Sequence, residues 1–469
     1  MKKITGNSPF WIIIGVFIIS RIILREMGVQ MNFWALYAYW QYLDVETLKQ
    51  HLINGVWYDH AQPPVFNLFL GLVLKIAGSQ SPLVFDFLFK CITLGNALLL
   101  FFIVKKITPI SFLPLLVTLA YILSPATMIF ECELFYTTLI SGFLLLSVYF
   151  LICFADKGSW LNAAGIIFPL VLLCLTRSVY HVVWLMLLAS TLIIYFRKTP
   201  AFKKLLLVSL IGVGMVGSWY VKNKIIFGKL TASTWIGMNI ARNVFHDNEV
   251  TDSSRIEAYA PFSQVNTYRK FTDTGYDRKF AGLNDRDLLM EMKNDSFINE
   301  TAVRYIPVSD LYLKASIDYI KSHPAAYMKN VMQSCILYFT PATMYSLAAG
   351  QSDKIKIYDV LYSFNLTHFA KSKQGRRILL SISAIPKCLL YLFVFFLLIR
   401  YNIKSRSFPP WNLFILLTIG FVFGISSFFE HYENMRFRFE TEPLFLILSA
   451  QVFSIIYFRC LTRRKSQGR

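Results

Sequence analysis

The sequence predicts an all-α polytopic membrane protein with about ten transmembrane helices. Of its 469 residues, 55% are hydrophobic and only 16% are charged, and the mean hydropathy is +0.50. Apolar runs near the length that crosses a hydrocarbon core recur from one end of the chain to the other. A transmembrane β-barrel would instead show short segments of alternating hydrophobicity, which this sequence lacks.

The apolar segments that we expect to cross the membrane are residues 9–25, 84–104, 108–124, 135–154, 160–176, 178–196, 204–221, 378–400, 410–428 and 443–459. The first follows a basic start and precedes no small-residue cleavage site, so we expect it to be retained rather than removed as a signal peptide. Residues 63–78 carry about 14 apolar residues, too few for a span, and are expected to form a helix along the outer surface.

The basic residues predict which side of the membrane each loop faces. The chain has 47 Lys and Arg against 27 Asp and Glu, a formal charge of +20. If the ten segments alternate, most basic clusters fall on one side, which should be the cytoplasm, and this placement favours lipid headgroups over nucleic acid as the partner. The group Lys371, Lys373, Arg376 and Arg377 would lie outside. Either residues 330–350 also cross the membrane, or this group meets an anionic ligand.

The same scheme divides the chain into three parts. Residues 1–221 form an N-terminal membrane domain whose first outer loop is 26–83. Residues 222–377 form a large outer loop with interfacial helices, and 378–469 form the last membrane helices and a basic cytoplasmic tail. The short cytoplasmic loops and the absence of a retention signal favour a bacterial inner membrane over the endoplasmic reticulum.

Acidic residues gather at the expected outer face. Asp44 and Glu46 follow an aromatic-rich stretch that is typical of a membrane interface, and His60 lies in the helix-breaking segment DHAQPP. Glu131 and Glu133 follow the third span. Acids at a membrane edge are costly and indicate function. Alternatively, the His60 segment is an ordinary solvated loop, and the two glutamates cap the next helix.

Cations lie on the same expected face. Arginine suits phosphate because its planar guanidinium forms two charge-assisted hydrogen bonds. Cations that snorkel from helix ends are the alternative. The candidates for binding phosphate are Arg177, Lys222, Arg242, Arg436 and Arg438. Acids and cations together indicate a reaction that needs a base and a stabilised phosphate leaving group.

Other enzyme classes find little support. The chain has no GxxxxGK[ST], GxSxG or HExxH motif and no convincing dinucleotide fingerprint. Its seven cysteines show neither CxxC nor Cys/His metal spacing. An enzyme that uses cytosolic nucleotide sugars would need a soluble cytoplasmic domain, and no inside loop is long enough for one.

The layout resembles the C-type glycosyltransferases, and within them glycosyltransferase family 39, the protein O-mannosyltransferases and bacterial lipid A aminoarabinose transferases. Asp44 matches the acid of the first outer loop. HAQPPV (60–65) resembles the family's His-Pro-Pro-Leu, with two inserted residues and a Val. Glu131 and Glu133 stand where an aspartate is commoner, and Arg177 ends a middle span. WYVKNKIIFGKLTASTWIGMNIAR (219–242) and RFRFETEPLFLILSA (436–450) resemble two later family segments.

The resemblance implies transfer of a sugar from a polyprenyl- or dolichyl-phosphate carrier to a hydroxyl of a protein, lipid or glycan, with inversion. Asp44 would be the general base, and the cations would stabilise the lipid phosphate. Glu46, His60, Glu131 and Glu133 would orient the acceptor or the sugar, and a divalent metal, if present, would bind Asp44 and Glu131.

Two alternatives remain. A transporter or flippase for a lipid-linked or anionic substrate would use similar cations, but it usually carries polar or broken helices near the bilayer midplane. A structural partner in a complex that assembles glycans would perform no chemistry of its own.

Overall fold

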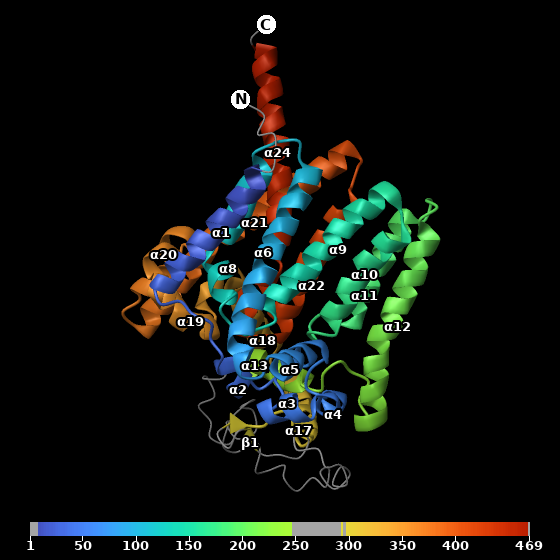
Figure 1. Ribbon diagram of the computed structural model, residues 1–469, viewed down its shortest axis with the longest axis vertical. Helices are drawn as coiled ribbons and strands as arrows, with labels where there is room; N and C mark the ends of the chain where they lie inside the picture. Colours follow the sequence, from blue (N-terminus) through green and yellow to red (C-terminus); the bar gives the residue numbers. More distant parts are fainter. Residues whose placement is uncertain (1–7, 246–291, 294–296, 468–469) are drawn as a thin grey trace.

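The computed structural model describes residues 8–245, 292–293 and 297–467. Upright helices form a bundle, with the start of α1 and the end of α24 at its upper end (Figure 1). Short helices and an antiparallel strand pair, β1 (Met292–Lys293) and β2 (Phe297–Ile298), lie at its lower end. The predicted helical class is therefore confirmed.

The first half of the chain comprises α1 (Ser8–Glu26), α2 (Trp34–Ala38), α3 (Val45–Gln50), α4 (Leu52–Tyr58), α5 (Val65–Ala77), α6 (Ser81–Ile107), α7 (Leu113–Ile122), α8 (Pro125–Phe130), α9 (Thr137–Lys157), α10 (Trp160–Cys174), α11 (Val182–Phe196) and α12 (Phe202–Phe227). The second half comprises α13 (Ile236–Phe245), α17 (Tyr305–Ser322), α18 (Pro324–Phe339), α19 (Ser346–Ser352), α20 (Lys356–Ser363), α21 (Lys373–Ser405), α22 (Pro410–Phe429), α23 (Asn434–Glu440) and α24 (Glu442–Gln467). Much of the expected outer loop 222–377 is thus helical, while its residues 246–291 and 294–296 lie outside the described ranges.

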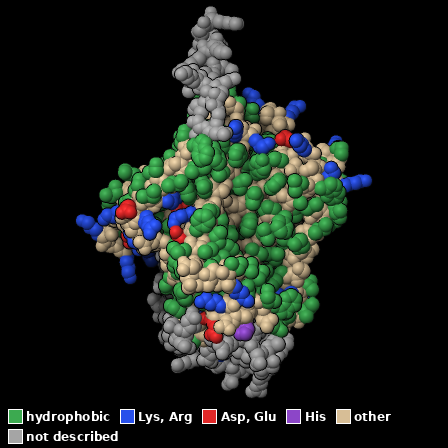
Figure 2. All heavy atoms as spheres, viewed as in Figure 1, with side chains coloured by type: hydrophobic (Ala, Val, Ile, Leu, Met, Phe, Trp, Pro, Cys, Tyr) green, Lys and Arg blue, Asp and Glu red, His purple; other side chains and the backbone are tan. Residues whose placement is uncertain are grey.

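Six helical segments within the described ranges are long and apolar enough to cross a membrane. They are Val65–Ile107, Thr137–Lys157, Phe202–Phe227, Lys373–Ser405, Pro410–Phe429 and Glu442–Cys460. Hydrophobic side chains cover the middle of the face seen in Figure 2, and many Lys and Arg side chains lie toward its upper edge. Such a large exposed apolar surface indicates contact with lipid, so the chain is a membrane protein.

The expected count of ten spans is not confirmed. The expected span 108–124 contains only the ten-residue helix α7, because Pro109 and Pro114 delay its start and Pro125 begins the separate helix α8. Helices α10 and α11 have 15 residues each, about 22 Å at 1.5 Å per residue, which is short for a 30 Å hydrocarbon core. Helix α1 carries Arg21 and Arg25 and is not among the six.

Residues 63–78, where a surface helix is expected, contain α5, which lies across the lower end of the bundle and packs against α3 and α4 (Figure 1). Helix α5 is also part of the apolar segment Val65–Ile107 named above. Gly78, at a positive φ of 52°, and a short 3-10 turn join it to the upright α6. A crossing by residues 330–350 is not supported, because α18 ends at Phe339 and Thr340 and Pro341 are extended.

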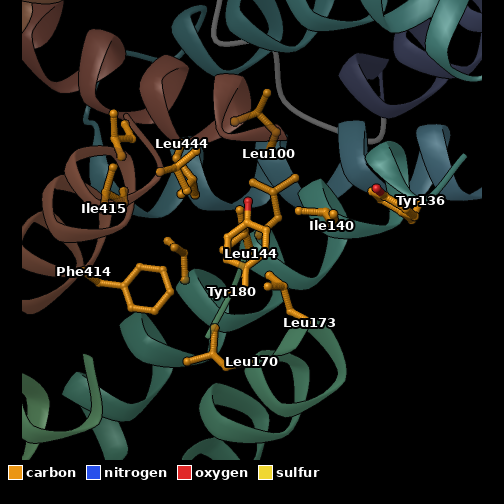
Figure 3. Packing of buried hydrophobic residues seen from close by; sticks show 14 of the residues in the cluster. Leu100, Tyr136, Ile140, Leu144, Leu170, Leu173, Tyr180, Phe414, Ile415 and Leu444 are labelled. Carbon is orange, nitrogen blue, oxygen red and sulfur yellow. The ribbon is translucent and has the colours of Figure 1, made fainter. Parts of the chain in front are cut away.

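The core is built around α9. Leu100, Ile140, Leu144, Leu170, Leu173, Phe414, Ile415 and Leu444 are buried together there and come from α6, α9, α10, α22 and α24 (Figure 3). All of these side chains are essentially inaccessible to solvent. This packing holds the chain segments that precede α9 and follow α10, which carry residues of the candidate site.

Candidate functional site

Three arginines and three glutamates form a buried network. The arginines are Arg177 after α10, Arg242 on α13 and Arg436 on α23. The glutamates are Glu430, Glu433 and Glu440, between the end of α22 and the end of α23. All six residues are at most 9% exposed. Three of the predicted phosphate-binding cations therefore lie in one cluster.

The contacts within this network are direct. Arg177 donates to Glu440, and Arg436 donates to Glu433. Arg436 also lies 3.4 Å from the Glu440 carboxylate. Arg242 lies 3.5 Å from Glu433 and 3.7 Å from Glu430, distances longer than typical charge-assisted hydrogen bonds. Because Glu433, Arg436 and Glu440 are three and four positions apart, helix α23 presents them together on one side.

Aromatic rings surround the guanidinium groups. The guanidinium carbon of Arg177 lies 3.7 Å from the ring centre of Phe437, and that of Arg436 lies 4.6 Å from that of Phe135. Tyr180 donates a hydrogen bond of 3.1 Å to Glu440. Such cation–π contacts strengthen when water is excluded, so these arginines are fixed in place.

The surroundings lower the pKa of one glutamate of the network and raise the pKa of another. Burial opposes ionisation of Glu433, but the charges of Arg436, Arg242 and Arg177 outweigh it and lower its pKa to about 2. For Glu430, burial and the nearby Glu433 charge raise the pKa to about 7. One carboxyl is therefore firmly ionised, and the other changes protonation near neutral pH.

Asp44 lies at the lower end and caps α3. Its Oδ1 accepts a hydrogen bond of 2.8 Å from the Glu46 backbone N–H. Its Oδ2 is buried and, among the residues that the structure describes, has no hydrogen-bond partner. Glu46 itself is exposed. A buried carboxylate oxygen without a donor is costly unless a substrate or water meets it, which makes Asp44 a candidate for a base.

The segment that leads to Asp44 packs against the arginine network. The Tyr136 hydroxyl donates to the Gln41 side chain at 3.0 Å, and the Tyr39 ring lies 4.7 Å from that of Phe135. The Arg242 guanidinium carbon lies 5.8 Å from the Trp40 ring centre. A layer of aromatic rings therefore joins the Asp44 segment to the arginines.

His60 and Lys222 do not belong to this network. They connect the α4–α5 loop to the end of α12 and to the chain segment that follows it. The Lys222 ammonium donates to the backbone oxygen of Asp59 at 2.7 Å, and His60 Nδ1 lies 2.8 Å from the Thr234 hydroxyl. Burial and the Lys222 charge lower the pKa of His60 to about 3, so its imidazole is neutral. These two predicted site residues hold the loop and do not join the arginine network.

Glu131 and Glu133 also lie in separate contacts. Both Glu131 oxygens accept from Arg21 of α1, at 2.7 and 2.8 Å. Glu133 accepts from Asn32 at 2.9 Å, and burial raises its pKa to about 8, although that hydrogen bond lowers it. Because Arg21 occupies both Glu131 oxygens, and no group of three metal-binding side chains is found in the described part of the chain, these residues do not fit a metal held by Asp44 and Glu131.

Arg438, the remaining predicted cation, lies in separate contacts. It donates to Glu442 and to the backbone oxygens of Tyr338 and Thr340, at 2.8 and 3.2 Å for the last two. Glu442 also accepts from Lys387 at 2.9 Å. Arg438 thus ties α23 to α18 and α24.

Sequence reasoning missed the glutamates that neutralise the arginines, Glu430, Glu433 and Glu440. A signal was available, because FEHYENMRFRFETEP alternates acids and arginines at helical spacing directly before an apolar segment. Arg21 was missed as well, although a lone arginine within an apolar run demands a buried partner.

The site can therefore supply the Asp44 carboxylate, one oxygen of which has no hydrogen bond in the described residues, beside a cluster of three arginines and three glutamates.

No protein family model, curated protein or solved structure matches this chain.

Proposed function

We propose that the protein is an integral-membrane glycosyltransferase. It moves a sugar from a polyprenyl- or dolichyl-phosphate carrier to an acceptor hydroxyl on the non-cytoplasmic face, with the bacterial inner membrane as the expected location. The observation that carries the proposal is the Asp44 carboxylate, which is buried with one oxygen bonded to Glu46 N–H and the other without a hydrogen bond in the described residues.

In the proposed reaction, Asp44 Oδ2 accepts the proton of the acceptor hydroxyl as that oxygen attacks the anomeric carbon. The new bond joins the acceptor oxygen to this carbon. The bond between the carbon and the lipid phosphate breaks, and its electron pair leaves with the phosphate oxygen. Because the attack is a single displacement, the configuration at the anomeric carbon inverts.

The leaving phosphate needs a positive partner, and Arg242 is the cation that we assign to it. Arg242 is the most exposed of the three arginines of the network, at 9% against 4% for Arg177 and 0% for Arg436. Arg242 also lies against Trp40, four residues before Asp44. In this assignment, Arg177 and Arg436 hold Glu433 and Glu440 in place and supply positive potential at a distance.

The test separates an enzyme from a transporter. Purified protein in detergent is given a panel of synthetic polyprenyl-phosphate sugars with candidate acceptors, and the glycosylated product and released polyprenyl phosphate are measured. An enzyme forms both in equal amounts. A transporter or flippase moves the intact lipid-linked sugar in vesicles and leaves the sugar–phosphate bond unbroken, and that result would contradict the proposal.

A further inference from the structure

A cavity of about 160 Å³ lies beside the arginine network, and the proposed chemistry does not use it. It is lined by the connection between α10 and α11, the connection between α12 and α13, the start of α13 and the end of α22. Its walls are formed by Ser178, Val179, His181, Thr231, Ala232, Ser233, Ile236, Asn239, Ile425, Phe429 and Glu430. The space exceeds the volume of one water, about 30 Å³ in the liquid.

Several residues that line this cavity are polar. Glu430 is only 7% exposed, and its Oε2 has no hydrogen bond among the described residues. Asn239 supplies an amide, and Ser178 supplies a hydroxyl. His181 Nδ1 accepts from the Val183 backbone N–H at 3.2 Å, so the hydrogen of its neutral ring is on Nε2. The lining thus offers both donors and acceptors.

The cavity also has apolar lining residues. Val179, Ile236, Ile425 and Phe429 line it, and Ile236 is 50% exposed. A few polar groups among apolar lining residues are typical of a small-molecule site. The arrangement suits a ring that has hydroxyls along its edge and C–H groups on its face.

The charge of Glu430 also limits the chemical class of ligand that the cavity can bind. Glu430 lines this cavity and Arg242 does not, so the ionised form of Glu430 disfavours a phosphate or carboxylate ligand inside the cavity. A sugar hydroxyl, in contrast, donates to a carboxylate oxygen in a strong charge-assisted hydrogen bond.

We infer that this cavity is the subsite for a sugar ring of the acceptor, so that the acceptor is a carbohydrate-bearing molecule. The inference rests on the proposed function, because a protein that transfers no sugar has no acceptor. Glu430 and Asn239 bind the ring hydroxyls, and Phe429 packs against the ring face. Glu430 lies 3.7 Å from Arg242, the residue assigned to the donor phosphate. The acceptor sugar at Glu430 and the donor phosphate at Arg242 would therefore lie next to each other.

Binding can be tested without turnover. Saturation-transfer NMR on the full-length protein in micelles measures the affinity for methyl glycosides of glucose, mannose, galactose and N-acetylglucosamine, with N-acetylthreoninamide as the polypeptide mimic. We expect at least one glycoside to bind and the mimic to give no signal. Glu430→Gln and Asn239→Leu should each weaken that glycoside about tenfold, the scale of one hydrogen bond to a charged group.

Two controls make the result specific. Asp310→Asn changes an acid on α17 whose side chain is 52% exposed, and it should bind glycosides as the wild type does. Asp44→Asn should also keep glycoside binding, because Asp44 does not line the cavity. Glycoside binding without any sugar transfer would therefore refute the enzyme while leaving the cavity assignment standing.

The inference is overturned if no glycoside binds to folded wild-type protein. It is also overturned if both Glu430→Gln and Asn239→Leu bind as tightly as the wild type. Binding of N-acetylthreoninamide that the same two variants weaken would assign the cavity to a polypeptide acceptor instead.

Discussion

Arg177 shows how this protein accommodates charge in its interior. The side chain is only 4% exposed, yet it contacts Glu440 and lies over the ring of Phe437. A buried charge is tolerated when a partner and hydrogen bonds replace its water. The same holds for Arg21 with Glu131. Asp44 and Glu430 differ from these arginines, since each has one carboxylate oxygen that is buried without a hydrogen bond in the described residues.

Removal of the Arg177 charge should destabilise the fold. We expect Arg177→Met to lower the free energy of unfolding by about 3–5 kcal/mol, because buried Glu440 loses its closest cation and keeps only Arg436 at 3.4 Å and the Tyr180 hydroxyl. Lys229→Ala is the matched control, since Lys229 pairs with Asp310 at 2.5 Å on the surface, and it should cost less than about 1 kcal/mol. Chemical unfolding in mixed micelles measures both. Equal, small losses would show that the buried pair contributes no more than the exposed one.

Glu133 should make stability depend on pH. Its folded-state pKa of about 8 lies above its ordinary value of 4.5, so the folded protein retains a proton that the unfolded chain releases between these values. The wild type therefore loses stability as pH rises through this range. Glu133→Gln cannot titrate, and its stability relative to the wild type should rise by more than about 2 kcal/mol between pH 5 and 8, since one pKa unit corresponds to about 1.4 kcal/mol. A pH-independent difference would contradict this prediction.

Among the elements, α13 carries Arg242 and is placed by its contact with α17. A Cβ on Gly237 would lie 1.7 Å from the Ser309 backbone oxygen, so the two helices approach too closely for any other residue. The Gly237 N–H also donates to the Ser309 hydroxyl at 3.1 Å. The position of Arg242 therefore depends on a single glycine.

Gly237→Ala should push α13 away from α17. We expect a loss of about 1–3 kcal/mol in unfolding free energy from overpacking, together with reduced sugar transfer because Arg242 moves with its helix. Gly217→Ala in α12 is the control, since a Cβ there meets nothing within 4 Å. Thermal unfolding and turnover are measured for both variants. A stable, fully active Gly237→Ala would rule out this role for the contact.

Elements with long, uninterrupted apolar runs could be predicted from the sequence. The expected spans 135–154 and 410–428 match α9 and α22 closely. The failures have local causes. Pro109 and Pro114 shorten α7, and His181 caps α11 with its side chain and so delays the helix start to Val182. Hydropathy averages over such backbone effects, so it overestimates the length of these helices.

Only part of the candidate site could be predicted from the sequence. The cations on α13 and α23 could be recognised because each is charged in an apolar setting. Their partners could not be assigned, because Arg177 and Glu440 are 263 positions apart in the chain. Lys222 and His60 were grouped with them on the basis of a shared face, but the fold directs these two to a loop joint.

The whole molecule has two distinct ends. The upper end carries the start of α1 and the end of α24, and the lower end carries α2–α5, α13 and α17 (Figure 1). Apolar side chains cover the region between them (Figure 2). Asp44 lies at the lower end, and the arginine network packs directly behind its segment, which fits a donor whose lipid tail remains in the membrane.

This organisation predicts that the two ends of α12 face opposite compartments. In a background without the native cysteines, Lys198→Cys before α12 should react with a membrane-impermeant maleimide only from the cytoplasmic side. Leu230→Cys after α12 should react only from the outer side. Both positions are exposed, Leu230 by 68%. Labelling of both residues from one side of intact cells would show that α12 does not span the membrane.

The most direct test of the central claim compares sugar transfer by the wild type and by Asp44→Asn, with Asp310→Asn as the control and donor binding measured in parallel. We predict a loss of at least about 100-fold for Asp44→Asn, the scale of general-base catalysis, with unchanged donor binding and full activity of the control. Turnover of Asp44→Asn at the wild-type rate would contradict the assignment of Asp44 as the base.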